Sequence, residues 1–203
     1  MAPTATTVMG LGQTAKEVGS LDQAQQLATF DIIMPEPTPP GFRITSVRYF
    51  KPDFRCTEDV DVNHCDRVHN DSVTFRLEGA DGRGFTYAQG YGVPFAGSYF
   101  FAPQTAKGSV AIDGREVHWV TGHLRPGIAP ASGQIADEHD WIFDGSMQLA
   151  WFQSRDENPT GTESSQCMGL ASTSLSLDEL LEIATSVPRA MAAPAQDPYS
   201  GRC

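Results

Sequence analysis

The sequence predicts an α+β fold, in which an antiparallel β-meander sheet is covered on one face by an N-terminal and a C-terminal helix. Two similar segments, SLDQAQQLATF from Ser20 and SLDELLEIATSV from Ser176, begin like helices near the two ends of the chain. The residues between them have the pattern of strands and turns, several with apolar side chains at alternate positions. Because no helix of crossover length separates these strands, we expect them to pair antiparallel.

Both helix starts carry the spacing of a capping box, in which the first hydroxyl and a carboxylate or amide three residues later satisfy free backbone N–H groups. The pairs are Ser20 with Gln23, and Ser176 with Glu179. Each helix has one apolar stripe to bury, formed by Leu21, Ala24, Leu27 and Ala28 in the first and by Leu177, Leu180, Leu181 and Ala184 in the second. Pro188 ends the second helix, and MPEPTPPGF forces an extended path after the first.

Six strands are predicted between the helices, at 42–50, 73–78, 85–89, 109–112, 115–121 and 147–152. Asp113 and Gly114 lie between two of them and form the strongest hairpin signal in the chain. A second hairpin is predicted near 80–84, and a third near Asp144 and Gly145.

Length and composition indicate one domain. A chain of 203 residues that is 40% hydrophobic buries about 70% of its unfolded surface around one core. We place this domain at 20–187, with a cysteine-bearing insert at 56–71. The stretch 1–19 is expected to be a flexible arm, and 188–203 an Ala/Pro-rich tail.

The charge balance argues against nucleic acid as a partner. The net charge is −11 and there is no basic stripe to offset phosphate repulsion. No apolar run approaches the roughly 20 residues that span a bilayer, so no transmembrane segment is expected. The first residues also lack the basic start and apolar centre of a secretory leader. A leader or anchor of an exported form is therefore not visible in this sequence.

The four cysteines bear on the cellular compartment. Cys56, Cys65, Cys167 and Cys203 form an even set that permits two disulfides in three connectivities. A bridge from Cys56 to Cys65 is favoured, and Cys167 with Cys203 is the second candidate, although the terminal Cys203 is equally suited to stay free or to pair between chains. Reduced thiols are the alternative. Two disulfides would favour an exported protein.

The insert contains the best pattern for metal binding. Asp59, Asp61 and Asn63 stand at alternate positions, as the first ligands of a calcium loop do. The match then fails, because His64 replaces the glycine and Asn70 the glutamate of such a loop. The candidate ligands are Asp59, Asp61, Asn63, His64 and Asp66. A zinc alternative, without the usual ligand spacing, uses Cys56, His64, Cys65 and His69. We favour a strand or tethered loop without metal, so no cofactor is expected and calcium is the alternative.

No catalytic residue is predicted. His118, His123 and His139, with the neighbouring acids Asp137, Glu138 and Asp140, contain the residue types of a metal or acid–base site. Their spacing specifies no such site, so we interpret them as surface or core histidines. The chain also lacks the G-x-S-x-G segment of a hydrolase nucleophile.

One stretch combines aromatic side chains with Gly and Pro, AQGYGVPFAGSYFFAP. Aromatic residues on a loop are typical of partner contacts. The predicted contact residues are Tyr91, Phe95, Tyr99, Phe100 and Phe101.

Five segments in order suggest a family: SLDQAQQLATF, IIMPEPTPPGFRITSV, SVAIDGREVHWV, MQLAWFQ and SLDELLEIATSV. The chain resembles an uncharacterised bacterial extracytoplasmic domain that occurs in membrane-tethered envelope proteins, some with parts like anti-sigma factors or lipoprotein carriers. The matching residues are Phe30, Pro35, Pro39, Pro40, Gly41, Phe42, Gly114, Trp151, Ile183, Ala184 and Ser186. The resemblance transfers no catalytic residue.

These observations predict a non-enzymatic, extracytoplasmic domain of the cell envelope that binds a protein partner or a second copy of itself, in a regulatory, sensory or surface-assembly role. One alternative is a metal-dependent or small-ligand-binding protein that uses the insert at 58–71. Another is a structural subunit of an extracellular assembly.

Overall fold

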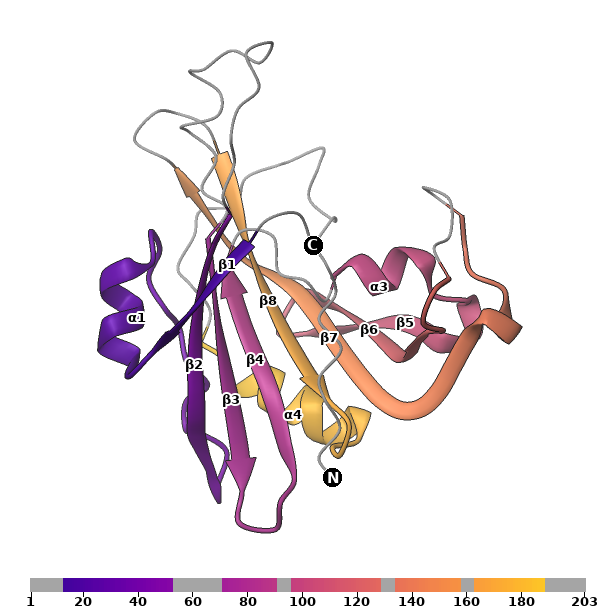
Figure 1. Cartoon of the computed structure of the whole chain (residues 1–203), viewed down its shortest axis with the longest axis horizontal. Helices are drawn as coiled ribbons and strands as arrows, with labels where there is room; N and C mark the ends of the chain where they lie inside the picture. Colours follow the sequence, from indigo (N-terminus) through magenta and orange to yellow (C-terminus); the bar gives the residue numbers. More distant parts are fainter. Residues whose placement is uncertain (1–12, 53–70, 91–95, 129–133, 158–162, 189–203) are drawn as a thin grey trace.

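The computed structural model describes residues 13–52, 71–90, 96–128, 134–157 and 163–188 (Figure 1). Its strands form one eight-stranded antiparallel sheet in the order β1-β2-β3-β4-β8-β7-β6-β5. The strands are β1 (Gln13–Val18), β2 (Phe42–Pro52), β3 (Ser72–Gly79), β4 (Gly84–Gly90), β5 (Lys107–Ile112), β6 (Arg115–Leu124), β7 (Trp141–Glu157) and β8 (Glu163–Ser172). The helices are α1 (Leu21–Leu27), α3 (Ala96–Phe101) and α4 (Leu177–Ser186), with 3-10 turns η1 (Gln104–Ala106) and η2 (Glu138–Asp140).

The six predicted strands correspond to β2 through β7, and the antiparallel pairing is confirmed. Two further strands, β1 and β8, carry no clear alternating signal in the sequence. β1 lies in the stretch expected to be an arm and pairs with β2 at one edge of the sheet. β8 pairs with β4 on one side and β7 on the other. The last strand therefore joins two meanders into a single sheet.

The same Asp-Gly dipeptide has two different roles. Asp113 (φ 49°) and Gly114 (φ 73°) make the tight turn from β5 to β6, as predicted. The hairpin predicted at Asp144 and Gly145 is wrong, because both residues lie inside β7. Gly145 has φ 82° at the point where the β6–β7 register shifts. Its positive φ produces a bulge there because β7 stays paired with β6 on both sides of it.

One face of the sheet carries the main core. A row of directly paired residues crosses five strands and consists of Val47, Phe75, Tyr87, Leu170 and Leu149. Each of these side chains is buried. Helix α4 packs Leu180, Ile183 and Ala184 into the same core. A smaller core on the opposite face contains Ala102, Ala106, Val120, Ala136 and Trp141.

The predicted fold class, a sheet covered on one face by two terminal helices, is wrong. The chain is mainly β, and the N-terminal helix does not cover the sheet. Helix α1 lies beside the β1–β2 edge (Figure 1). Its Leu21 and Leu27 are each 36% exposed, and only Ala24 is fully buried. A helix of seven residues is too short to bury a stripe across a sheet of this width.

An extended segment after α1 occupies the position predicted for the helix. Phe30 is 5% exposed, and Ile32, Ile33 and Met34 pack against the main core. Gln89 of β4 accepts a hydrogen bond from the Ile33 N–H (2.8 Å) and donates one to the Asp31 carbonyl (2.6 Å). Because a sheet side chain satisfies these backbone groups, the segment is stable without helical hydrogen bonds.

Candidate functional site

A groove of about 290 Å³ opens between the proline-rich segment and α4. It is lined by Pro37, Pro39, Pro40, Phe42, Leu175, Glu179, Glu182, Ile183 and Ser186. The residues from α4 stand at positions i, i+3, i+4 and i+7, so they share one helix face. The groove therefore has one wall of prolines and one wall of helix.

The lining is mainly apolar, and its side chains are held in place by packing against the core. Leu175 is 4% exposed and Ile183 6% exposed. The Phe42 ring meets the Phe85 ring edge-on, with centroids 5.3 Å apart. The two walls are joined where the Glu36 N–H donates to the Ser186 carbonyl at 2.8 Å.

Acidic side chains stand along the helix wall. One Glu179 oxygen accepts from Arg83 Nη1 at 2.6 Å, and the other accepts from the Ser176 N–H at 2.8 Å. The Ser176 backbone N–H and the Arg83 guanidinium hold the pKa of Glu179 below its usual range. Glu182 is exposed and has no ion-pair partner among the described residues. The predicted capping box at Ser176 and Glu179 is confirmed.

Both ends of α4 are tied to the sheet. At its start, Ser172 Oγ donates to the Gly84 carbonyl (2.6 Å) and accepts from the Leu175 N–H (3.0 Å). At its end, Arg115 donates to the Ala184 carbonyl (3.3 Å) and to the Val187 carbonyl (3.2 Å). The helix wall is therefore fixed with respect to the sheet.

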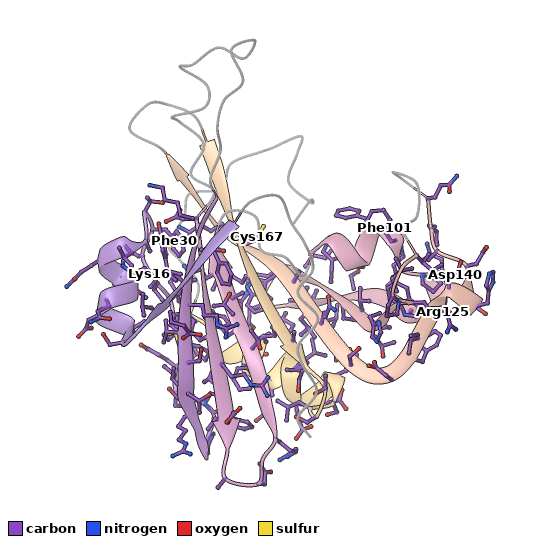
Figure 2. All side chains as sticks on the ribbon, in the orientation of Figure 1. Lys16, Phe30, Phe101, Arg125, Asp140 and Cys167 are labelled. Atoms are coloured by element: carbon purple, nitrogen blue, oxygen red, sulfur yellow. The ribbon has the colours of Figure 1, made fainter. Side chains whose placement is uncertain are left out.

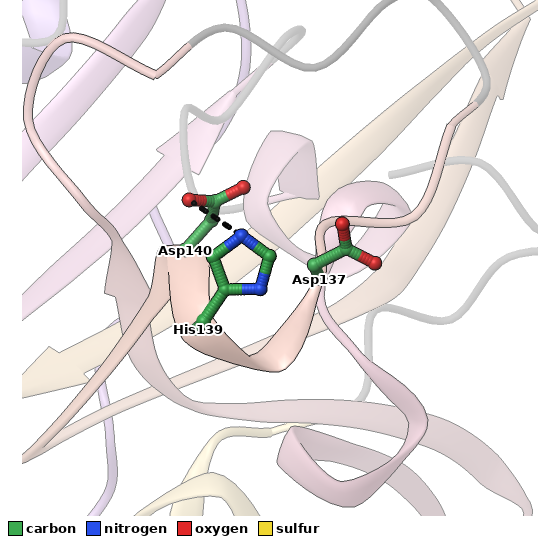
Figure 3. Close-up of side chains that lie close together, drawn as sticks. All are labelled: Asp137, His139 and Asp140. Atoms are coloured by element: carbon green, nitrogen blue, oxygen red, sulfur yellow. Dashed lines mark ion pairs between the residues drawn. The ribbon is translucent and has the colours of Figure 1, made fainter.

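A second group of titratable side chains lies on and next to η2 (Figure 3). Ligand atoms of Asp137, His139 and Asp140 all lie within 4.8 Å of one another. His139 Nε2 lies 3.5 Å from Asp140 Oδ1, and its side chain is 77% exposed. Among the described side chains none adds a fourth ligand and none orients the imidazole by a hydrogen bond, so this group is an exposed contact between an imidazole and a carboxylate, with a second carboxylate nearby.

The other two histidines of the predicted set have different neighbours. His123 Nε2 lies 3.3 Å from Asp144 Oδ2. The His118 ring packs against Tyr99, with centroids 4.7 Å apart. Neither histidine belongs to the group on η2, and the interpretation of the three as surface or core residues stays a prediction.

The described members of the aromatic contact set lie on α3, whose last residue, Phe101, is labelled in Figure 2. Tyr99 is partly buried, and its carbonyl accepts from Lys107 Nζ at 3.0 Å. Phe100 is 44% exposed, and the Phe101 carbonyl accepts from the Ala136 N–H. Tyr91 and Phe95 lie outside the described residues. A partner surface on α3 stays a prediction.

Of the four cysteines, the structure describes Cys167, which is labelled in Figure 2. It is 5% exposed and disulfide-bonded. Cys56, Cys65 and Cys203 lie outside the described residues, so the two pairings stay predictions. The candidate metal ligands of the insert also lie outside them: Asp59, Asp61, Asn63, His64 and Asp66.

The groove was not predicted from the sequence. A signal for its helix wall was present in the spacing of Glu179, Glu182, Ile183 and Ser186, and a signal for the other wall in PEPTPPGF. Nothing in either segment shows that they face each other. No helix among the described residues is long and apolar enough to cross a membrane.

Comparisons with protein-family models, curated proteins and solved structures give no match to this chain. Its own geometry and chemistry therefore carry the functional argument.

Proposed function

We propose that this chain is a non-enzymatic, extracytoplasmic domain of the cell envelope that binds a protein partner through the groove beside α4. The observation that carries the proposal is an apolar groove between a wall of prolines and a helix fixed at both ends. Glu179 and Glu182 of the helix wall form its acidic rim. The extracytoplasmic setting is supported by the disulfide at Cys167, since disulfides persist in oxidising compartments.

The size of the groove suits one or two side chains of a protein partner. Its volume of about 290 Å³ is at the lower limit for a small-molecule site and suits one or two side chains of a partner segment. Interfaces gain most of their free energy from a few residues that fill such pockets. Proline walls have little conformational freedom to lose, so binding is less opposed by entropy.

Filling the groove with a large side chain tests the proposal. Ser186 is partly buried in the groove, whereas Thr185 is exposed on the same turn of α4. Ser186→Trp is expected to abolish capture of the partner from an envelope extract, and the matched control Thr185→Trp to leave it unchanged. The captured proteins are compared by quantitative mass spectrometry.

A second blocking variant guards against a folding defect in the first. Pro40 is exposed on the opposite wall, so Pro40→Trp fills the same space from the other side. Each variant is used only if its melting temperature stays close to that of the wild type. Identical capture by the wild type and both blocking variants, or no specific capture at all, would overturn the proposal.

A further inference from the structure

The groove presents hydrogen-bond acceptors but almost no free donors. Three of its lining residues are prolines, which have no N–H, and three are the hydrocarbon side chains of Phe42, Leu175 and Ile183. The one lining hydroxyl, Ser186 Oγ, donates to the Ile183 carbonyl at 2.7 Å. An anionic ligand would find no partner here, so the ligand must supply the donors itself.

The nearby cations are already engaged. Arg83 binds Asp81 at 2.7 Å and Glu179 at 2.6 Å. Arg115 donates to the carbonyls of Ala184, in the last turn of α4, and of Val187, its C-cap, and lies over the Trp151 ring. Arg83 therefore pairs with Glu179 of the helix wall, and among the described residues neither guanidinium pairs with Glu182.

One carboxylate of the lining, that of Glu182, remains available, and Glu36 lies next in the chain to the lining residue Pro37. Glu36 is also joined by its backbone N–H to Ser186 in the helix wall. Both are exposed, and neither has an ion-pair partner among the described residues. Helix α4 has no basic residue in its last turn. The chain as a whole carries a net charge of −11, which attracts cationic segments.

We infer that the groove binds a short basic segment of a partner protein, in which a Lys or Arg pairs with Glu182 and a neighbouring apolar side chain packs on Leu175 and Ile183. This inference rests on the proposed function and adds the chemistry of the partner. Lys and Arg carry only donors, which complements a lining of acceptors. Ile183 follows Glu182 directly in α4, so both contacts lie within one helical turn.

The test uses the full chain and a positional library of hexapeptides, in which each residue type is fixed in turn at each position. The bound peptides are expected to be enriched in Lys or Arg near Leu, Ile, Phe or Pro. The best peptide is then made with norleucine in place of its basic residue, and both forms are measured by fluorescence anisotropy at low and high salt.

Glu182→Gln is expected to weaken binding of the basic peptide by about tenfold, as for the loss of a charge-assisted hydrogen bond. The norleucine peptide is expected to bind the wild type and the variant equally, because it has no charge to pair with Glu182. The two proteins and two peptides together form a double-mutant cycle, which isolates the free energy of the ion pair. Glu116→Gln, an equivalent change at an exposed acid of β6, is the matched control and should have no effect.

Three results would overturn the inference: enrichment of neutral or acidic peptides, no peptide binding, or unchanged affinity in Glu182→Gln. The first can be separated from failure of the proposed function. If a neutral peptide binds and Ser186→Trp abolishes its binding, the groove is a binding site but its ligand is not basic. If no binding depends on the groove, both proposals fail.

Discussion

Replacing Arg115 by alanine is expected to release the C-terminal end of α4 from the sheet. The Arg115 guanidinium donates to the Val187 carbonyl at 3.2 Å and to the Ala184 carbonyl at 3.3 Å. Its Cζ lies 5.9 Å from the centroid of the Trp151 ring. Ala184 and Val187 are each 1% exposed. The Ala184 carbonyl keeps a hydrogen bond from the Val187 N–H at 3.3 Å, whereas the Val187 carbonyl loses its Arg115 donor in a place where water has little access.

The expected cost is about 3 kcal/mol. A hydrogen bond from a charged donor contributes about 1.5–3 kcal/mol, and both bonds here are long, so we take the lower value for each. A cation–π contact adds about 0.5–1 kcal/mol. This gain is offset in the wild type because the partly buried guanidinium loses some of its hydration. For a domain of this size, 1 kcal/mol shifts the melting temperature by roughly 2–4 °C. Arg115→Ala should therefore melt about 6–12 °C below the wild type.

The free energy of unfolding is measured by urea titration, followed by tryptophan fluorescence, with thermal melts as a second measurement. Arg43→Ala is the control, because Arg43 is exposed on β2 without an ion-pair partner among the described residues. Its effect should stay within about 0.5 kcal/mol. Arg115→Lys should give an intermediate value, since an ammonium keeps the charge but not the two-pronged geometry.

A loss below about 1 kcal/mol in Arg115→Ala would refute this reasoning. Full stability in Arg115→Lys would also contradict it, because the charge alone would then be sufficient and the two directed hydrogen bonds would contribute nothing.

Three further predictions concern pH and backbone geometry. Burial and the adjacent Asp71 carboxylate raise the pKa of Tyr49 to about 12, so the neutral phenol contributes stability that is complete below about pH 10 and is lost as the pH rises toward 12. The free energy of unfolding should therefore fall less between about pH 10 and about pH 12 in Tyr49→Phe than in the wild type, and parallel curves would contradict the assignment. The pKa of Glu179 is lowered by Ser176 and Arg83, so the stability that its carboxylate contributes is present above the unfolded pKa of about 4.3 and is lost as the pH falls through the lower folded pKa. The melting-temperature difference between wild type and Glu179→Gln should therefore shrink from about pH 7 to about pH 3, and a constant difference would refute this prediction. Gly122 and Gly145 both have positive φ, but an added Cβ lies 2.3 Å from the Ile142 carbonyl oxygen at Gly122 and meets nothing within 4 Å at Gly145. Chemical denaturation should therefore show that the free energy of unfolding falls by about 1 kcal/mol in Gly145→Ala and by about 3 kcal/mol or more in Gly122→Ala. Equal losses would contradict this prediction, because the close contact at Gly122 would then be relieved by movement of the backbone.

The elements that the sequence predicted correctly depend on neighbouring residues. Ser176 Oγ accepts from the Glu179 N–H, and the Glu179 carboxylate accepts in return from the Ser176 N–H. Ser20 likewise accepts from the Gln23 N–H, although the Gln23 side chain accepts from Gly19 instead. These interactions span three or four residues, so they are visible in a short segment of sequence.

The errors concern contacts between distant segments. SLDQAQQL has a capped start and one apolar stripe, as α4 does, but it forms one short helix at an edge of the sheet. The residues that cover this part of the core come from the extended segment that follows. Their backbone groups are satisfied by Gln89, which is more than 50 residues away in the chain. No local pattern in either segment contains that pairing.

The sequence by itself determined the cap and apolar face of α4, six of the strands, the Asp113–Gly114 turn and the acidic charge of the chain, because each follows from residues a few positions apart or from composition. Only the tertiary structure decided that β8 enters between β4 and β7, that Asp144–Gly145 is a bulge, and that prolines 37, 39 and 40 face Glu182 across a groove. These features depend on which distant segments bury surface against each other, and that choice is made by the free energy of the whole core rather than by any one segment.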